Sequence, residues 1–214
     1  MIEISNISKK YTKAAQVFTA LDDVSFTIVK GDFCSVTGSS GAGKSTLLYV
    51  IGGLIHPDSG TVKYNGNDIY RLSSRDSNQY RRKHLGFMFQ QFHLMPYLTV
   101  AENIRLACND NEHSEKTDYY LEKCSLSELK SKYPSELSVG EKQRTAFIRA
   151  IISKPDILLA DEPTGNLDTL NSEILMSLVK DYNNSGGTVV MVSHDPAIAR
   201  FAGKSITLNK GRLE

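Results

Sequence analysis

The sequence lacks the features that would place it among nucleic-acid-binding, membrane-spanning or exported proteins. Its 214 residues carry 25 Lys and Arg against 24 Asp and Glu, so the broad positive charge expected of a protein that binds a nucleic-acid backbone is missing. Its longest apolar runs, such as Ile157 to Ala160, have the length of strands and fall well short of the roughly 18 residues that span a bilayer. Residues 1–10 alternate polar and apolar side chains and do not resemble a signal peptide.

Cysteine is also scarce. The three cysteines, Cys34, Cys108 and Cys124, are odd in number and lack the paired spacing of a metal site, which favours a reducing compartment and predicts a cytoplasmic protein. The remaining composition, 40% hydrophobic and 23% charged, is that of an ordinary globular protein. A chain of this length buries roughly 70% of its unfolded surface. We therefore expect residues 1–214 to form a single domain.

Strand-like apolar runs alternate with helix-like stretches along most of the chain. The clearest runs are residues 33–37, 157–160, 188–193 and 205–208. This alternation predicts an α/β fold whose core is a mostly parallel sheet. The first thirty residues and the segment 60–69, which contains the turn signal Asn65-Gly66, are typical of short antiparallel strands and predict a side sheet.

Residues from about 91 to 150 show no strand signal. They are typical of helices joined by polar loops, including the acidic, polar stretch 109–118, and we expect a helical subdomain inserted in the α/β core. The sequence contains no internal repeat, low-complexity tract or sustained heptad, so it predicts no coiled-coil arm.

A glycine-rich loop lies between one strand-like run and one helix-like stretch. Residues 38–45 match the pattern GxxxxGK[ST]. Glycines allow such a loop to fold into a nest of backbone N–H donors at the N-terminal end of the next helix, where phosphate groups bind. Lys44 then reaches the β- and γ-phosphates, and Ser45 can hold Mg²⁺. The alternative is a glycine turn with a purely structural role. The predicted nucleotide-binding residues here are Gly38, Ser39, Ser40, Gly41, Ala42, Gly43, Lys44, Ser45 and Thr46.

Two carboxylates follow the apolar run 157–160. Asp161 and Glu162 stand where this strand ends, and in open α/β sheets ligands bind at the carboxyl ends of the strands. Asp161 is the expected partner of Mg²⁺. Neighbouring residues point in different directions, so Glu162 is placed to polarise an attacking water. A pair of acids is also typical of a solvated strand end, and it is the glycine loop that favours the functional interpretation.

A third motif stands just upstream of this acidic strand. Residues 137–141 read Leu-Ser-Val-Gly-Glu and resemble the LSGGQ signature of ATP-binding cassette (ABC) ATPases. The resemblance extends along the whole chain, in order and in spacing. It implies a P-loop NTPase core, Mg²⁺-dependent hydrolysis of ATP to ADP and phosphate, and catalytic roles for Lys44, Glu162 and His194.

The resemblance also implies roles for two residues nearer the amino terminus. Tyr11 is similar to the aromatic residue that stacks on adenine, and Gln90 is similar to the glutamine that joins Ser45 and Asp161 at Mg²⁺. Each has a simpler alternative. Tyr11 is one of ten tyrosines and can pack on its own strand, and Gln90 adjoins Gln91, which leaves the register open.

Two further residues resemble family motifs in the carboxyl-terminal part. Asp168 ends a segment that is similar to the D-loop, and His194 follows the apolar run 188–193 as the switch histidine does. The strand would deliver His194 to the same sheet edge as Glu162, near the γ-phosphate. The alternatives are an ordinary loop aspartate and a structural histidine.

The signature departs from its consensus at Val139 and Glu141. A β-branched residue such as Val139 is tolerated where its φ is negative. Ser138 and Glu141 have the spacing of a capping box, so one interpretation is that they cap their own helix. In the other, which the resemblance implies, Ser138, Gly140 and Glu141 meet ATP that is bound to a second subunit. Both interpretations can apply in different states.

The chain has one glycine loop and one signature. The resemblance implies that these two motifs meet across a head-to-tail pair, so a twofold homodimer would close two ATP sites. ATP should favour the closed dimer and hydrolysis should release it, because only the triphosphate bridges both halves.

Residues 92–103 and Gly165 to Asp168 are similar to the ABC subgroup that includes lipoprotein-releasing, macrolide-exporting, antimicrobial-peptide-resistance and cell-division proteins. This similarity implies an integral membrane permease as partner, a peripheral position on the cytoplasmic face of the cell membrane and no nucleic-acid partner. The side chains that either contact a permease or pack within the helical lobe are Phe92, Leu94, Met95, Tyr97 and Leu98.

Two other functions stay open at this point. A soluble ABC-type ATPase of DNA repair shares these motifs but carries long coiled coils or zinc modules, and one of translation joins two cassettes in one chain. The sequence has neither feature. Lys44, Asp161 and Glu162 are all present, which argues against a module that has lost its activity.

Overall fold

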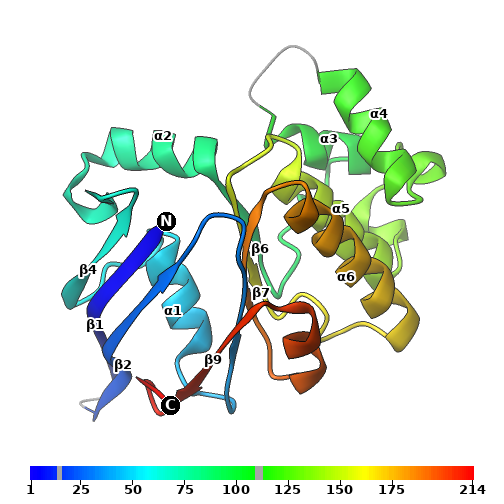
Figure 1. Cartoon of the computed structure of the whole chain (residues 1–214). Helices are drawn as coiled ribbons and strands as arrows, with labels where there is room; N and C mark the ends of the chain where they lie inside the picture. Colours follow the sequence, from blue (N-terminus) through cyan, green and yellow to red (C-terminus); the bar gives the residue numbers. More distant parts are fainter. Residues whose placement is uncertain (14–15, 109–112) are drawn as a thin grey trace.

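The computed structural model describes residues 1–13, 16–108 and 113–214. It contains a four-stranded sheet, a six-stranded sheet and helices on both sides of the larger sheet (Figure 1). The predicted α/β class, with a mostly parallel sheet and an antiparallel side sheet, is confirmed.

The side sheet is antiparallel and has the order β2-β1-β4-β5. Alternation along its first strand buries Ile2 and Ile4 against the core, which is why residues 1–10 show a polar and apolar pattern. Asn65 and Gly66 both have positive φ, as a tight hairpin turn requires. The strands are β1 (Ile2–Lys13), β2 (Gln16–Ile28), β4 (Ser59–Tyr64) and β5 (Asn67–Asp68).

The core sheet has the order β10-β9-β3-β8-β7-β6, and only its β9–β10 pair is antiparallel. Every residue of β7 and β8 is buried, as expected for strands covered on both faces. The strands are β3 (Phe33–Thr37), β6 (Leu85–Met88), β7 (Ile157–Asp161), β8 (Thr188–Val192), β9 (Lys204–Asn209) and β10 (Arg212–Leu213).

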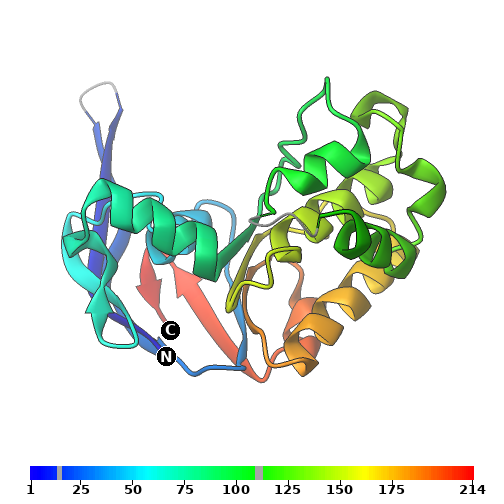
Figure 2. The same ribbon diagram turned by 90° about the horizontal axis from the view of Figure 1, so that it is seen from above.

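The α-helices form two groups, as Figures 1 and 2 show. Helices α1 and α2 lie with β1, β2 and β4 on one side of the core sheet, and α3 to α6 gather on the other. Short 3₁₀ turns, η1 (Ile69–Arg71), η2 (Ser127–Leu129), η3 (Pro134–Glu136) and η4 (Pro196–Phe201), join these elements. The helices are α1 (Lys44–Ile51), α2 (Ser74–His84), α3 (Val100–Arg105), α4 (His113–Lys123), α5 (Val139–Ile151) and α6 (Thr169–Asn184).

The described residues between 91 and 150 form helices and turns and no strand, as the sequence predicts. Residues 109–112 of the predicted polar stretch lie outside the described part of the chain. Helix α2 and strand β6 are among the elements that were not predicted. Helix α2 buries no residue and therefore has no apolar face to show in the sequence. Strand β6 has four residues and follows α2 directly, so its apolar run is short.

Alternate residues of the core strands pack into two hydrophobic clusters, one on each face of the sheet. In β7, Leu159 packs with Leu47 and Leu48 of α1. Leu158 packs on the opposite face with Phe147 of α5. Among the residues that the structure describes, no helix is both long and apolar enough to cross a lipid bilayer.

Candidate active site

The glycine loop crosses from the end of β3 to the start of α1 in a space that excludes larger residues. A Cβ on Gly38 would lie 2.2 Å from the carbonyl oxygen of Leu208, and one on Gly43 would lie 2.0 Å from that of Ala20. Gly43 also has φ of +102°, which L residues rarely adopt. The loop is therefore held between β9 and β2, and these two glycines are required for its path.

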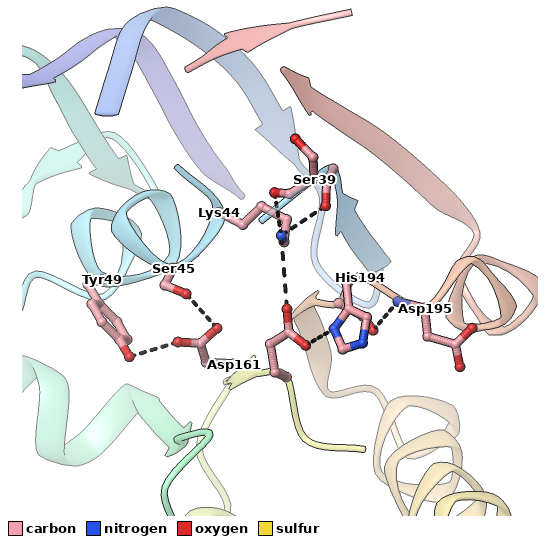
Figure 3. Close-up of polar contacts among 10 residues, drawn as sticks. Ser39, Lys44, Ser45, Tyr49, Asp161, His194 and Asp195 are labelled. Atoms are coloured by element: carbon pink, nitrogen blue, oxygen red, sulfur yellow. Dashed lines mark hydrogen bonds and ion pairs between the residues drawn. The ribbon is translucent and has the colours of Figure 1, made fainter. Parts of the chain in front are cut away.

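Lys44 folds back over this loop (Figure 3). Its Nζ donates to the carbonyl oxygens of Gly38 and Ser39 at 2.9 and 3.0 Å, and it lies 3.9 Å from Oε1 of Glu162. The side chain is 6% exposed, so a positive charge is held at the mouth of the glycine loop with little competition from water.

Asp161 ends β7 and is 2% exposed. Its Oδ1 accepts a hydrogen bond from Ser45 Oγ at 2.9 Å, and its Oδ2 accepts one from Tyr49 Oη at 2.7 Å. Burial, and secondly the hydrogen bond to Asp161, raise the pKa of Tyr49 well above its ordinary value, so its hydroxyl stays a donor. Sequence reasoning missed Tyr49, although it stands four residues after Ser45 and hence on the same face of α1.

The donor set around Asp161 fits Mg²⁺. This ion prefers oxygen ligands, usually one or two carboxylates together with substrate phosphates and water. Ser45 Oγ and Asp161 Oδ1 lie 2.9 Å apart beside the glycine loop, where the phosphates are expected. Among the described residues there is no cluster of three or more His, Cys, Asp or Glu side chains that would form a metal cage of its own.

Glu162 follows Asp161 but turns to a different set of partners. Its backbone has φ of +47°, an unusual conformation for a residue other than glycine, and its N–H donates to the carbonyl of Val192 at 2.9 Å. The side chain lies between Lys44 and His194, and its Oε2 is hydrogen-bonded to Nδ1 of His194. A left-handed conformation at a non-glycine residue often marks a functional site. The structure thus brings together all three predicted catalytic residues.

Ser138 and Glu141 cap their own helix. Ser138 Oγ accepts from the backbone N–H of Glu141 at 3.3 Å, and Oε2 of Glu141 accepts from the N–H of Ser138 at 2.7 Å. The capping-box interpretation of this pair therefore holds in the single chain. Val139 is helical and does not have a positive φ, so its β-branched side chain causes no backbone strain.

Gly140 in α5, the helix that carries the signature, and Asp168 at the start of α6 lie where these two helices meet. A Cβ on Gly140 would lie 2.4 Å from Oδ1 of Asn171 in α6. Asp168 caps α6 by accepting from the backbone N–H and the Nδ2 of Asn171, and these hydrogen bonds lower its pKa. Arg144 of α5 donates to Oδ1 of Asn171 at 2.9 Å. The hydrogen bond between Arg144 and Asn171 therefore joins the N-terminal parts of α5 and α6. Sequence reasoning did not single out either residue.

A second link joins the signature helix to the acidic strand end. Gln143 is buried, and its Nε2 donates to the carbonyl oxygen of Pro163 at 2.5 Å. Pro163 directly follows Glu162. The register of α5 is thus tied to the turn that carries Glu162.

Tyr11, Thr46 and Gln90, which are also predicted to bind nucleotide or Mg²⁺, lie on β1, on α1 and just after β6. Tyr11 is 40% exposed and pairs with Phe18 across the β1–β2 hairpin. Phe18 stands two residues before Ala20, whose carbonyl group lies against Gly43. The hairpin therefore brings Tyr11 toward the glycine loop without a hydrogen bond to it. Thr46 lies half-buried in the first turn of α1. Gln90 is exposed just beyond β6.

Hydrogen bonds from two side chains, Asn103 and Arg149, hold the loop after Gln90. Asn103 is fully buried and donates to the carbonyls of Met95, Leu98 and Thr99. Arg149 of α5 donates at 2.6 Å to the carbonyls of Phe92 and His93, and its burial lowers its pKa. Of the predicted contact residues, Tyr97 is 72% exposed and Met95 37% exposed. The others, Phe92, Leu94 and Leu98, are half-buried.

The site combines a strand, a glycine loop and a helix with a buried aspartate at the end of β7, a parallel strand that β8 separates from β3. These features define a P-loop nucleoside triphosphatase. The family model described as ABC transporter matches residues 21–165. The chain belongs to this family and is an ABC transporter ATPase.

The relatives agree with the subgroup indicated by the sequence. The chain is 38% identical to the lipoprotein-releasing system ATP-binding protein LolD of Shewanella oneidensis, across all of this chain and 96% of LolD. It is 39% identical to the macrolide export ATP-binding/permease protein MacB of Chlorobaculum tepidum, across 99% of this chain but 33% of MacB. It thus spans about a third of the length of MacB.

Solved structures of similar sequence share the whole fold. The dimeric structure of MJ0796, a bacterial ABC transporter cassette, matches with a TM-score of 0.94 and 37% identity, over 100% of this chain and 97% of that one. A dimeric post-hydrolysis state of the same cassette, bound to ADP and Pi, matches with a TM-score of 0.93 and 36% identity over the same shares. These comparisons do not favour the alternative of a repair or translation ATPase.

Proposed function

We propose that this chain hydrolyses ATP in a head-to-tail homodimer and thereby drives an integral membrane permease. The observation that carries the proposal is the meeting of Lys44, Glu162 and His194 at one edge of the core sheet, beside the Ser45 and Asp161 pair. The chemistry of each group follows from its position in this cluster.

Lys44 and the glycine loop bind the phosphates. The ammonium group already lies across the loop with two carbonyl partners, so a β- or γ-phosphate can replace one of them without a large movement. Ser39, Ser40, Gly41 and Ala42 supply backbone to this cradle, and Thr46 lies in the first turn of the helix behind it.

Glu162 is the general base. Its carboxylate is 13% exposed and is held between Lys44 and His194, which keeps it pointed at the place where the γ-phosphate would lie. Proton transfer to a positioned carboxylate typically contributes about 10²- to 10⁴-fold to a rate. His194 orients this carboxylate and is 61% exposed, so it also has access to the phosphate.

Ser45, Asp161 and Gln90 would hold Mg²⁺ when nucleotide is bound. Bound Mg²⁺ neutralises charge on the β- and γ-phosphates. The two oxygens of Asp161 accept from Ser45 and Tyr49. Tyr11 would stack on the adenine ring, because it is partly exposed on the hairpin next to the loop.

The signature belongs to the site of the second subunit. Ser138 is exposed at the N-terminal end of α5, with Gly140 and Glu141 in the first turn, and Asp168 caps the adjoining α6. A helix N-terminus attracts anions, and the γ-phosphate on the partner's loop is the anion that a head-to-tail dimer supplies. Twofold symmetry then gives two such sites per dimer.

The permease would dock beside the loop that follows Gln90. A cleft of about 420 Å³ lies there, lined by residues that include Phe87, Phe89 and Leu106. Leu106 is 56% exposed, and Tyr97 and Met95 add apolar surface on the same loop. The helices between about residues 91 and 150 act as a subdomain that carries this surface, within a cassette of residues 1–214. The chain would then lie on the cytoplasmic face of the cell membrane.

Measurement of phosphate release by the purified chain tests the enzymatic part of this proposal. We expect release of phosphate from ATP that requires Mg²⁺ and stops in EDTA. Lys44→Ala should weaken nucleotide binding and with it turnover, whereas Lys180→Ala, at an exposed position of α6, should leave both unchanged. Equal loss in both variants would contradict the role of Lys44.

Copurification from membranes tests the partner. A tagged chain should bring down an integral membrane permease. Recovery of ribosomes or DNA, without a permease, would contradict the transporter proposal and return the soluble ATPase as the alternative.

A further inference from the structure

Asp161 accepts hydrogen bonds from two hydroxyl groups that lie on one face of helix α1. Ser45 and Tyr49 stand four residues apart in α1, one helical turn, and each donates to a different oxygen of the same carboxylate (Figure 3). The distances are 2.9 Å from Ser45 and 2.7 Å from Tyr49. The carboxylate is 2% exposed, so these two donors largely replace the water that it would otherwise bind.

The two hydroxyl groups differ in whether they would also bind Mg²⁺. Ser45 Oγ is itself a predicted ligand, so one of its lone pairs would face the metal while its O–H donates to Asp161. The metal would then restrict the directions in which this O–H can donate. Tyr49 Oη faces Oδ2, the other oxygen, and has no such second task. It can therefore keep the plane of the carboxylate fixed throughout binding.

The ring of Tyr49 also touches the segment that carries Gln90. Its centroid lies 6.1 Å from that of Phe89, the residue before Gln90, in a tilted arrangement. Phe89 stacks in turn on Phe87 of β6, at 5.5 Å between centroids. Tyr49 thus contacts Asp161 directly and the Gln90 segment through Phe89.

From this geometry we infer that Tyr49 is a positioning residue for Mg²⁺: its hydroxyl orients Asp161, so that Oδ1 faces the metal together with Ser45. The inference rests on the proposed function, because it needs Mg²⁺ to bind beside the glycine loop. Groups that hydrogen-bond to a metal-ligating carboxylate typically change metal affinity or activity about 10- to 100-fold when they are removed.

Mg²⁺-dependent binding of a fluorescent, non-hydrolysable ATP analogue is the test. Tyr49→Phe keeps the ring beside Phe89 and removes only the hydroxyl. We expect the Mg²⁺ concentration at half-maximal binding to rise about tenfold in this variant. Binding of the same analogue in EDTA should stay unchanged, because the glycine loop and Lys44 carry it. A general structural defect would weaken both.

Tyr70→Phe is the matched control. Its hydroxyl also contacts α1, by donating to the carbonyl of Val50 at 2.5 Å, but it does not touch Asp161. This control should have the Mg²⁺ midpoint of the wild type. Equal midpoints for the wild type and Tyr49→Phe would overturn the inference, as would equal shifts in Tyr49→Phe and Tyr70→Phe. Failure of the wild type to bind the analogue with Mg²⁺ would overturn the proposed function as well.

Discussion

In the proposed function the N-terminal ends of α1 and α5 both face a phosphate, yet their sequences and hydrogen bonds differ. The N-cap of helix α1 is Gly43, which offers no side-chain cap, and the first turn carries no acidic residue. The N-cap of helix α5 is Ser138, which forms a capping box with Glu141, an acidic residue in the first turn. The backbone N–H groups at the start of α1 are therefore open to an anion, whereas those of α5 are partly occupied.

The difference fits the proposed function, in which α1 binds phosphate with groups of its own chain and α5 contacts the phosphate of a second chain in the dimer. Lys44, Asp161 and Glu162 all lie close to the N-terminal end of α1 in the same chain. Near the N-terminal end of α5, Gln143 and Arg144 form hydrogen bonds to neighbouring segments, and Ser138 is exposed. A capped, acidic helix end should bind phosphate weakly by itself. We expect it to do so only when dimerisation brings ATP against it.

The largest expected effect is on ATP turnover, from the substitution Glu162→Gln next to the α1 end. Turnover should fall about 10²- to 10⁴-fold, because a general base is lost while the shape of the residue is kept. The dissociation constant for ATP should change little, since Lys44 and the glycine loop remain. Steady-state phosphate release and equilibrium binding together measure both quantities. Glu173→Gln, at an exposed position of α6, is the control, and normal turnover in Glu162→Gln would reject the assignment.

Gly140→Ala should damage the signature half and spare the nucleotide half. The new Cβ would lie 2.4 Å from Oδ1 of Asn171, which Arg144 and Asp168 hold in place. Overpacking of this kind costs about 1 to 3 kcal/mol of unfolding free energy. ATP-driven dimerisation should be lost, with ATP binding by the monomer retained.

Gly203→Ala is the control for this substitution, because nothing lies within 4 Å of its added Cβ and its φ is not positive. Thermal unfolding and light scattering would compare the two variants. Dimerisation of Gly140→Ala at wild-type concentrations of ATP would show that the close fit between α5 and α6 is not needed.

Two substitutions at Ser138 separate its capping role from its proposed role in the dimer. Ser138→Ala removes the cap and should cost about 1 kcal/mol of unfolding free energy. Ser138→Asp keeps a good cap but adds a negative charge where the partner's γ-phosphate should lie. We expect Ser138→Asp to be as stable as the wild type in thermal unfolding and yet to fail to dimerise with ATP. If Ser138→Asp dimerises normally, Ser138 does not face phosphate.

The smallest expected effect concerns the pH dependence of the cap on α6. Hydrogen bonds from Asn171 hold the pKa of Asp168 below its ordinary value. Since the folded pKa lies below the unfolded value of about 3.9, this contribution to stability is complete above that pH and is lost as pH falls through the folded pKa. The Tm difference between the wild type and Asp168→Asn should therefore narrow on acidification below about pH 4. A difference that does not depend on pH would mean that the charge contributes nothing.

The sequence predicted those parts of the site that local patterns determine. Parallel strands place their carboxyl ends at one edge, so the acids after 157–160 and the histidine after 188–193 could be expected to meet the glycine loop. Contacts that depend on the packing of one helix against another element could not be predicted in this way. The bonds of Tyr49 to Asp161, and of Gln143 to Pro163, join residues far apart in the chain.

The polar helix α2 escaped prediction for a different physical reason. Hydrophobic periodicity reveals a helix only when one face is buried, and α2 buries none of its residues. Its N-cap, Ser73, accepts from the N–H of Asp76, and basic residues fill its last turn. Its contacts with the rest of the protein come from partly buried side chains such as Tyr80, which packs against the core. In contrast, every residue of β7 is buried and its apolar run was evident.

The central claim, that two copies are needed to complete one ATP site, is tested most directly by the molar mass of Glu162→Gln measured by light scattering on a sizing column. With ATP and Mg²⁺ the mass should be twice that of the single chain, and with ADP or without nucleotide it should be that of one chain. The same variant with Ser138→Asp added should remain a monomer in ATP. A monomeric mass for Glu162→Gln in saturating ATP, or a dimer that forms equally well without nucleotide, would contradict the account.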